Sequence, residues 1–275
     1  MYNQLPNRRR TGYLSFLLAF AALCAGCADL KGINKFSANA GSVVATPLPY
    51  WYSDYSYDSC YTFPGASCDT TIPRLNDTTI AHEAGKLNAY FTALTKLSGS
   101  AEIIDVDTVA GAVTAGTYGK LSVTSTEASI FSGAATAAQD LFTAGFKSKH
   151  LTENLHRYGY YIDSAIGSYA KHVEVLAGYS GDLFEYLRTK WIIYKATGDP
   201  RDPTQWSVLY AYSSKLKELR DIHGQFEKLK KQLVLVREGY RDLLVSADKP
   251  KSKALKQRLF ALVNNITFLS NGTKN

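Results

Sequence analysis

Apolar side chains recur every three or four residues over most of the stretch between residues 148 and 246. The first half of this pattern comprises Leu151, Leu155, Tyr158, Ile162, Ala165, Tyr169, Val173, Leu176, Tyr179, Leu183, Leu187, Trp191 and Tyr194. The second half comprises Leu209, Tyr212, Leu216, Leu219, Ile222, Phe226, Leu229, Leu233, Val236, Tyr240 and Leu243. Such spacing places the apolar side chains on one face of an α-helix. We therefore expect two helices of roughly 40 residues, each about 60 Å long at a rise of 1.5 Å per residue.

The two halves are separated by Gly198-Asp199-Pro200-Arg201-Asp202-Pro203. Glycine ends helices readily and proline cannot continue one, so this segment is expected to form a hairpin turn. The apolar period is close to 3.5, which favours an antiparallel, coiled-coil-like pair that buries both patterns along their length. Gly178 and Gly181 weaken the first helix and are candidate positions for a bend.

Shorter helical patterns flank this hairpin at residues 28–45, 76–97 and 252–269. In the second of these, Asp77, Thr78 and Thr79 are capping residues ahead of the first apolar position, Ile80. The region from 100 to 145, rich in Ala, Gly, Ser and Thr, is interpreted as two helices broken near residues 116–119. These patterns predict an all-α protein, an elongated helical bundle built on the long hairpin, with residues 76–275 as the bundle domain.

The first residues carry the features of an export signal. Arg8, Arg9 and Arg10 precede an apolar run from Tyr13 to Cys24, and no acidic residue occurs before Asp29. The run is shorter than the roughly 20 residues that a membrane-spanning helix needs.

The run ends in Leu23-Cys24-Ala25-Gly26-Cys27, which resembles the lipobox of bacterial lipoproteins, although Cys24 stands where leucine is commonest. The resemblance implies that residues 1–26 are removed as a signal peptide and that Cys27 carries the lipid. It also implies that Ala28 directs the protein to the outer membrane, facing the periplasm or the exterior. An ordinary export signal with an unrelated cysteine is the alternative.

Cys60 and Cys68 are the two cysteines that remain after processing, and they lie eight residues apart within the segment 27–75. Pro64 and Gly65 turn the chain between them, which favours a disulfide in an oxidising compartment. Metal binding by this pair is the alternative. The loop around them is irregular and rich in tyrosine, and it could stack on glycans, rest at a membrane interface or pack across the bundle.

The net charge of the chain excludes few classes of function. Removing the leader with its three arginines leaves 28 basic and 24 acidic residues, a balance that does not indicate nucleic-acid binding. The basic residues that gather between residues 228 and 258 include Lys228, Lys230, Lys231, Arg237, Lys249, Lys251, Lys253, Lys256 and Arg258. They could contact anionic lipid headgroups, and a solvated helix face explains them equally well.

Catalytic signatures are missing from the sequence, which contains no phosphate-binding loop, nucleophile elbow or His-Glu-x-x-His zinc motif. Glu153 and His156 form one Glu-x-x-His, and His223 is a candidate third ligand for a small metal site, but a di-iron bundle needs a second such motif. We therefore assign no catalytic residue, metal or cofactor.

Three functional interpretations follow. The first is a noncatalytic envelope lipoprotein, held to the membrane through Cys27, whose long helices act as a scaffold for an envelope partner. The second is a membrane-active helical protein resembling pore-forming toxins in architecture alone. The third is a metal-binding bundle or enzyme that uses Glu153, His156 and His223.

Overall fold

The structure is a computed structural model that describes residues 30–46, 77–99, 125–143, 148–199 and 201–271. Within these ranges the chain forms six helices and no strand, which confirms the all-α prediction. The helices are α2 (Lys31–Val44), α4 (Asp77–Ser98), α6 (Ser125–Thr143), α7 (Ser148–Thr197), α8 (Pro203–Val245) and α9 (Lys253–Asn271).

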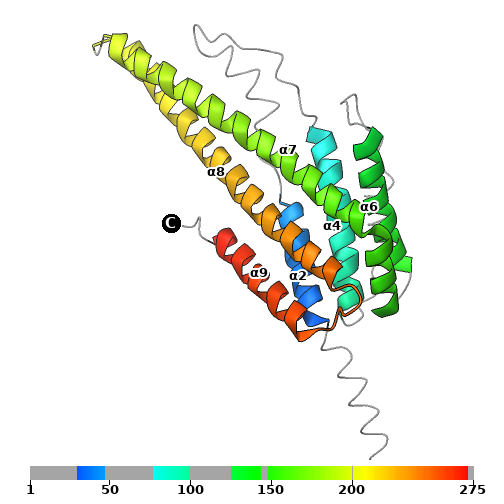
Figure 1. Cartoon of the computed structure of the whole chain (residues 1–275). Coiled ribbons are helices and arrows are strands. Elements are labelled where there is room, and N and C mark those ends of the chain that lie inside the picture. Colours follow the sequence, from blue (N-terminus) through cyan, green and yellow to red (C-terminus); the bar gives the residue numbers. More distant parts are fainter. Residues whose placement is uncertain (1–29, 47–76, 100–124, 144–147, 200, 272–275) are drawn as a thin grey trace, which may run out of the picture.

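The long helices α7 and α8 form the hairpin on which the other helices pack (Figure 1). Pro203 occupies the first turn of α8 and Asp202 caps it, accepting a hydrogen bond of 2.9 Å from the backbone N–H of Thr204. At the other end, the Thr152 hydroxyl at the start of α7 donates to the carbonyl oxygen of Ala247, 3.0 Å away. The two helices are therefore antiparallel, and α7 continues through the glycines that were expected to weaken it.

A compact body surrounds one end of this hairpin. Helix α2 packs between α4, α8 and α9, and α6 packs between α4 and α7. Phe36 of α2 is fully buried and meets the ring of Phe91 edge to face at 6.3 Å. The ring of Phe36 also packs over Gly239 of α8, where an added Cβ would lie 2.3 Å from it. Helix α2 thus belongs to the helical unit that the sequence predicted for residues 76–275.

The other end of the hairpin projects beyond the remaining described helices as a two-helix arm (Figure 1). We define the arm as residues 182–197 of α7 and 203–222 of α8. In the body, the predicted apolar faces are buried, with Ile162, Tyr169 and Leu233 fully inaccessible. In the arm, Leu183 and Leu216 are only half-buried. The prediction that both faces are buried along their whole length therefore holds only in part in the arm. Leu187, Tyr212, Leu219 and Ile222 are buried there, but two helices alone do not fully enclose each other's apolar face.

Observed helix boundaries differ little from those expected: the first helix covers 31–44 instead of 28–45, and the last covers 253–271 instead of 252–269. Of the two helices expected between 100 and 145, α6 is present at 125–143, and the expected break near 116–119 lies outside the described residues. Cys27, Cys60 and Cys68 also lie outside them. Among the described helices, none combines the length and apolar character needed to cross a bilayer.

Candidate functional site

The arm exposes large apolar side chains close to its turn. In the described part of the chain, ten large hydrophobic residues are exposed, and five of them belong to the arm: Tyr186, Ile192, Ile193, Trp206 and Tyr210. Trp206 is 61 % exposed and Tyr210 is 79 % exposed. Exposed apolar side chains that gather into a patch are typical of surfaces that contact another molecule, so the arm is a candidate contact surface. We call these five residues the tip residues.

The turn between the two helices that carry the tip residues is held by two aspartates. Asp199 accepts a hydrogen bond of 2.9 Å from the backbone N–H of Arg201. Asp202 accepts from both the backbone N–H and the hydroxyl of Thr204, and these bonds lower the pKa of its carboxyl group. The start of α8, and with it Trp206, is therefore fixed relative to the turn.

Cationic side chains lie over several aromatic rings of the arm. The ammonium group of Lys190 is 5.5 Å from the ring centre of Tyr186, and that of Lys195 is 5.0 Å from the ring of Trp191. The guanidinium group of Arg220 lies over Phe184 at 5.6 Å. These cation–π contacts order long cationic side chains beside the aromatic rings of the arm.

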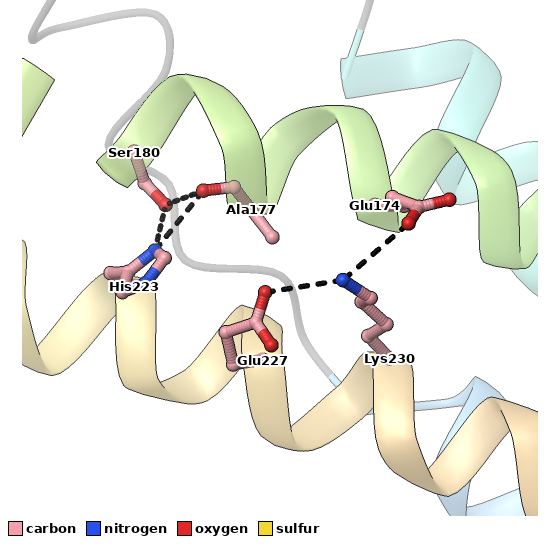
Figure 2. Close-up of polar contacts among 6 residues, drawn as sticks. All are labelled: Glu174, Ala177, Ser180, His223, Glu227 and Lys230. Atoms are coloured by element: carbon pink, nitrogen blue, oxygen red, sulfur yellow. Dashed lines mark hydrogen bonds and ion pairs between the residues drawn. The ribbon is translucent and has the colours of Figure 1, made fainter. Parts of the chain in front are cut away.

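Ser180 and His223 form a polar contact where the arm leaves the body (Figure 2). Nδ1 of His223 is 3.0 Å from both the Ser180 hydroxyl oxygen and the carbonyl oxygen of Ala177. The hydroxyl itself donates to the same carbonyl over 2.8 Å. Because a carbonyl oxygen only accepts hydrogen bonds, Nδ1 carries the proton. His223 therefore donates at this position, and the contact joins α7 to α8 without activating Ser180 as a nucleophile.

One step further into the body, Lys230 joins the same two helices (Figure 2). Its ammonium nitrogen is 3.5 Å from a carboxylate oxygen of Glu174 on α7 and 3.4 Å from one of Glu227 on α8. Both carboxylates raise the pKa of Lys230, Glu227 most strongly. The root of the arm is thus fixed by two successive polar contacts between α7 and α8.

A buried charged cluster lies within the body, between α4, α6 and α7. Oε2 of Glu83 is 2.7 Å from Nδ1 of His172, and Nε2 of the same ring is 4.0 Å from a carboxylate oxygen of Glu127. Burial raises the pKa of Glu83, which is 1 % exposed. The hydrogen bond to Glu83 raises the pKa of His172. Glu83 and His172 thus form a buried hydrogen bond across the interface between α4 and α7.

Sequence reasoning missed this cluster. No sequence motif includes Glu83, and nothing in the sequence links it to a histidine 89 positions away. The only available signal was the occurrence of a carboxylate and an imidazole on the apolar faces of two predicted helices.

The residues proposed for a metal site are not brought together. Glu153 pairs with Lys149 and His150, at 3.6 and 3.4 Å. His156 instead contacts Asp248 at 2.8 Å, and His223 lies at the root of the arm. In the ranges that the structure covers, no group of three or more His, Cys, Asp or Glu side chains is arranged to hold a metal ion.

Several of the basic residues between 228 and 258 have partners within the protein. Besides Lys230, Arg237 and Arg241 both bind the carboxylate of Asp163, with four hydrogen bonds of 2.8 to 3.1 Å. Arg258 pairs with Asp242 at 3.0 Å. Part of the basic segment thus stabilises the helical packing.

Comparison with protein families, with characterised proteins and with solved structures returned no match for this chain. The chemistry of the arm and of the body is accordingly the basis on which a function is assigned.

Proposed function

We propose that the chain is a lipid-anchored protein of the bacterial cell envelope, in which the body acts as a base and the arm presents an interaction surface to another envelope protein. The observation that carries this proposal is the projecting arm with its exposed tip residues. Trp and Tyr dominate the binding energy of protein interfaces, because their rings bury a large area at a small cost in conformational entropy.

The position of α2 supports the same orientation. An added Cβ at Gly32, in the first turn of α2, would lie 3.1 Å from the backbone of Lys256, in the first turn of α9. Ala247, which follows α8, contacts Thr152 at the start of α7. All these helix ends lie at the end of the molecule opposite the turn of the hairpin (Figure 1).

The anchor and the tip would therefore be far apart. Cys27 precedes Leu30, the first described residue, by three positions. Helix α7 has 50 residues, so at 1.5 Å per residue it is about 75 Å long. Lipid on Cys27 would hold the body at the membrane and place the tip residues several nanometres from it. This geometry suits a spacer that reaches a partner across part of the periplasm.

The interaction proposal is tested by photocrosslinking in intact cells. A photoreactive amino acid replaces Tyr210 in one strain and Val245 in another. Both positions are exposed residues of α8, at 79 % and 87 %, but they lie at opposite ends of the helix. We expect a discrete crosslinked protein from position 210 and none from 245. Equal products from both positions, or none from position 210 in correctly localised protein, would contradict the proposal.

The anchor is tested separately. Replacement of Cys27 by Ser should abolish incorporation of labelled fatty acid, which the unchanged protein should show. Incorporation that persists in the variant, or that is missing from the unchanged protein, would overturn the assignment of Cys27. The disulfide between Cys60 and Cys68 stays a prediction, testable by the mass of thiol-alkylated protein before and after reduction.

A second candidate function is direct action on a membrane. The observation that favours it is the combination of exposed Ile192, Ile193 and Trp206 with the cations of the arm, since aromatic and basic side chains favour the interface of a bilayer. Leakage of dye from vesicles that receive the purified protein, reduced by replacing Trp206 and Tyr210 with Ser, would establish this function in place of a protein partner.

A further inference from the structure

Four lysines gather at the end of the body that lies opposite the arm. Lys31 begins α2, Lys249 and Lys251 lie in the turn between α8 and α9, and Lys253 begins α9. All four side chains are exposed. We call them the basal lysines.

The contacts of the backbone place these four residues together. Gly32, next to Lys31, packs against Lys256, one turn along α9 from Lys253. Between the two helices, the N–H of Lys249 donates to Ser246 over 2.8 Å, and the N–H of Ser252 donates to Lys249 over 3.0 Å. The connection is therefore a compact turn that keeps its lysines beside the start of α2.

Two acidic residues at this end of the described chain, Asp242 and Asp248, have partners other than the basal lysines. Asp248 contacts His156 at 2.8 Å, and Asp242 contacts Arg258 at 3.0 Å. Within the described residues, none of the basal lysines takes part in an ion pair. Among the described residues, the basic side chains thus fall into those that stabilise the helical packing and an exposed cluster that makes no ion pair.

We propose that the basal lysines bind the headgroups of anionic phospholipids, so that this end of the body rests on the membrane surface. The proposal rests on the proposed function for its orientation, since Cys27 would attach lipid three residues before Leu30. Charge complementarity identifies the partner: exposed lysines beside a membrane anchor are attracted by the negative surface of a leaflet and bind it at short range. The lipid would retain the protein at the membrane, and the lysines would set the direction of the arm.

The experiment uses the full chain purified from its host, and its intact mass first reports whether Cys27 carries lipid. The protein is placed on vesicles of phosphatidylcholine alone, or with phosphatidylglycerol added, and treated with an amine-reactive reagent. Mass spectrometry then gives the labelling rate of each lysine. Lys195 and Lys217, which are exposed on the arm, are internal controls.

We expect the basal lysines to be labelled more slowly on vesicles that contain phosphatidylglycerol, and the two control lysines to be labelled equally on both. Raising the salt from about 0.1 to 1 M shortens the screening length from about 10 to 3 Å and should remove the protection. Equal labelling of the basal lysines on both kinds of vesicle would overturn the proposal, even if the mass shows lipid on Cys27.

If the mass shows no lipid, the anchor fails and the lysines are tested by binding alone. The unlipidated chain is floated with vesicles that contain phosphatidylglycerol, beside the variant Lys249→Gln/Lys251→Gln/Lys253→Gln and a matched arm variant, Lys190→Gln/Lys195→Gln/Lys217→Gln. Each basal lysine is expected to contribute about fivefold to partitioning, so the basal variant should bind roughly 100-fold more weakly. Equal binding by the two variants would overturn the proposal.

Discussion

Nδ1 of His172 on α7 lies 2.7 Å from Oε2 of Glu83 on α4, and the carboxylate is almost fully buried. The hydrogen bond to Glu83 raises the pKa of His172 above its ordinary value of 6.5. A raised histidine pKa contributes stability that is complete below the unfolded value and is lost as the pH rises through the folded one. Burial also raises the pKa of Glu83 from 4.5, so that its buried carboxyl group acts in the same direction.

The melting temperature should therefore fall as the pH rises from 6 to 9, and Glu83→Gln should flatten this dependence. Thermal unfolding followed by circular dichroism at a series of pH values measures it. Glu153→Gln is the matched control, because that exposed carboxylate also lies near a histidine, His150, at 3.4 Å. A pH dependence that is unchanged by Glu83→Gln would contradict the role of the buried pair.

Asp163 holds two arginines of α8 to α7. Burial raises the pKa of its carboxyl group, but hydrogen bonds from Arg237 and Arg241 outweigh this effect and the pKa is lowered from 3.8. Its contribution is present above 3.8 and is lost as the pH falls through the lowered value. Asp163→Asn should reduce the free energy of unfolding by about 2 kcal/mol at pH 7.

Urea unfolding at pH 7 and at pH 3 measures this prediction, with Asp182→Asn on the exposed face of the arm as control. The difference between Asp163→Asn and the unchanged protein should be smaller at pH 3. A difference that does not depend on pH would show that the carboxylate charge is unimportant.

Phe226 packs in the core between α7 and α8 and is 1 % exposed. Phe226→Asp should lower the free energy of unfolding by at least about 3 kcal/mol, since loss of the ring alone costs that much and a buried charge adds to it. Val234 on the same helix is 59 % exposed, so Val234→Asp should have little effect. Denaturant unfolding of both variants measures the difference. Similar stabilities would contradict the finding that Phe226 lies on the buried face of α8 and Val234 on its exposed face.

Two glycines of α8 should respond in opposite ways to alanine. A Cβ at Gly239 would lie 2.3 Å from the buried ring of Phe36, whereas a Cβ at Gly224 would meet nothing within 4 Å. Gly239→Ala should destabilise the protein by about 1 to 3 kcal/mol through overpacking. Gly224→Ala should stabilise it by up to about 1 kcal/mol, because alanine favours a helix. Melting temperatures that shift in the same direction would contradict the close packing of α2 on α8.

Much of the helical structure was predictable because apolar residues recur with the period of a helix over long stretches. The turn at 198–203 was predictable from its glycine and prolines, and Pro203 begins α8 in the position where proline is tolerated. These are local features, and each is determined by residues that are neighbours in the chain.

Contacts between distant helices were not predictable in this way. The apolar pattern continues into the arm, so the sequence alone does not show that Leu183 and Leu216 lose the cover that Ile162 and Leu233 receive. The number of helices around each part of the hairpin decides this. The pairing of Glu83 with His172 depends on the same packing.

The unbroken course of α7 has a mechanical consequence. Its first half packs within the body, whereas its far end projects together with α8 beyond the other described helices, and the contact between Ser180 and His223 lies where these two parts meet. Because α7 is one continuous helix, a small tilt of the body would produce a larger sideways displacement of the turn and of Trp206 beside it.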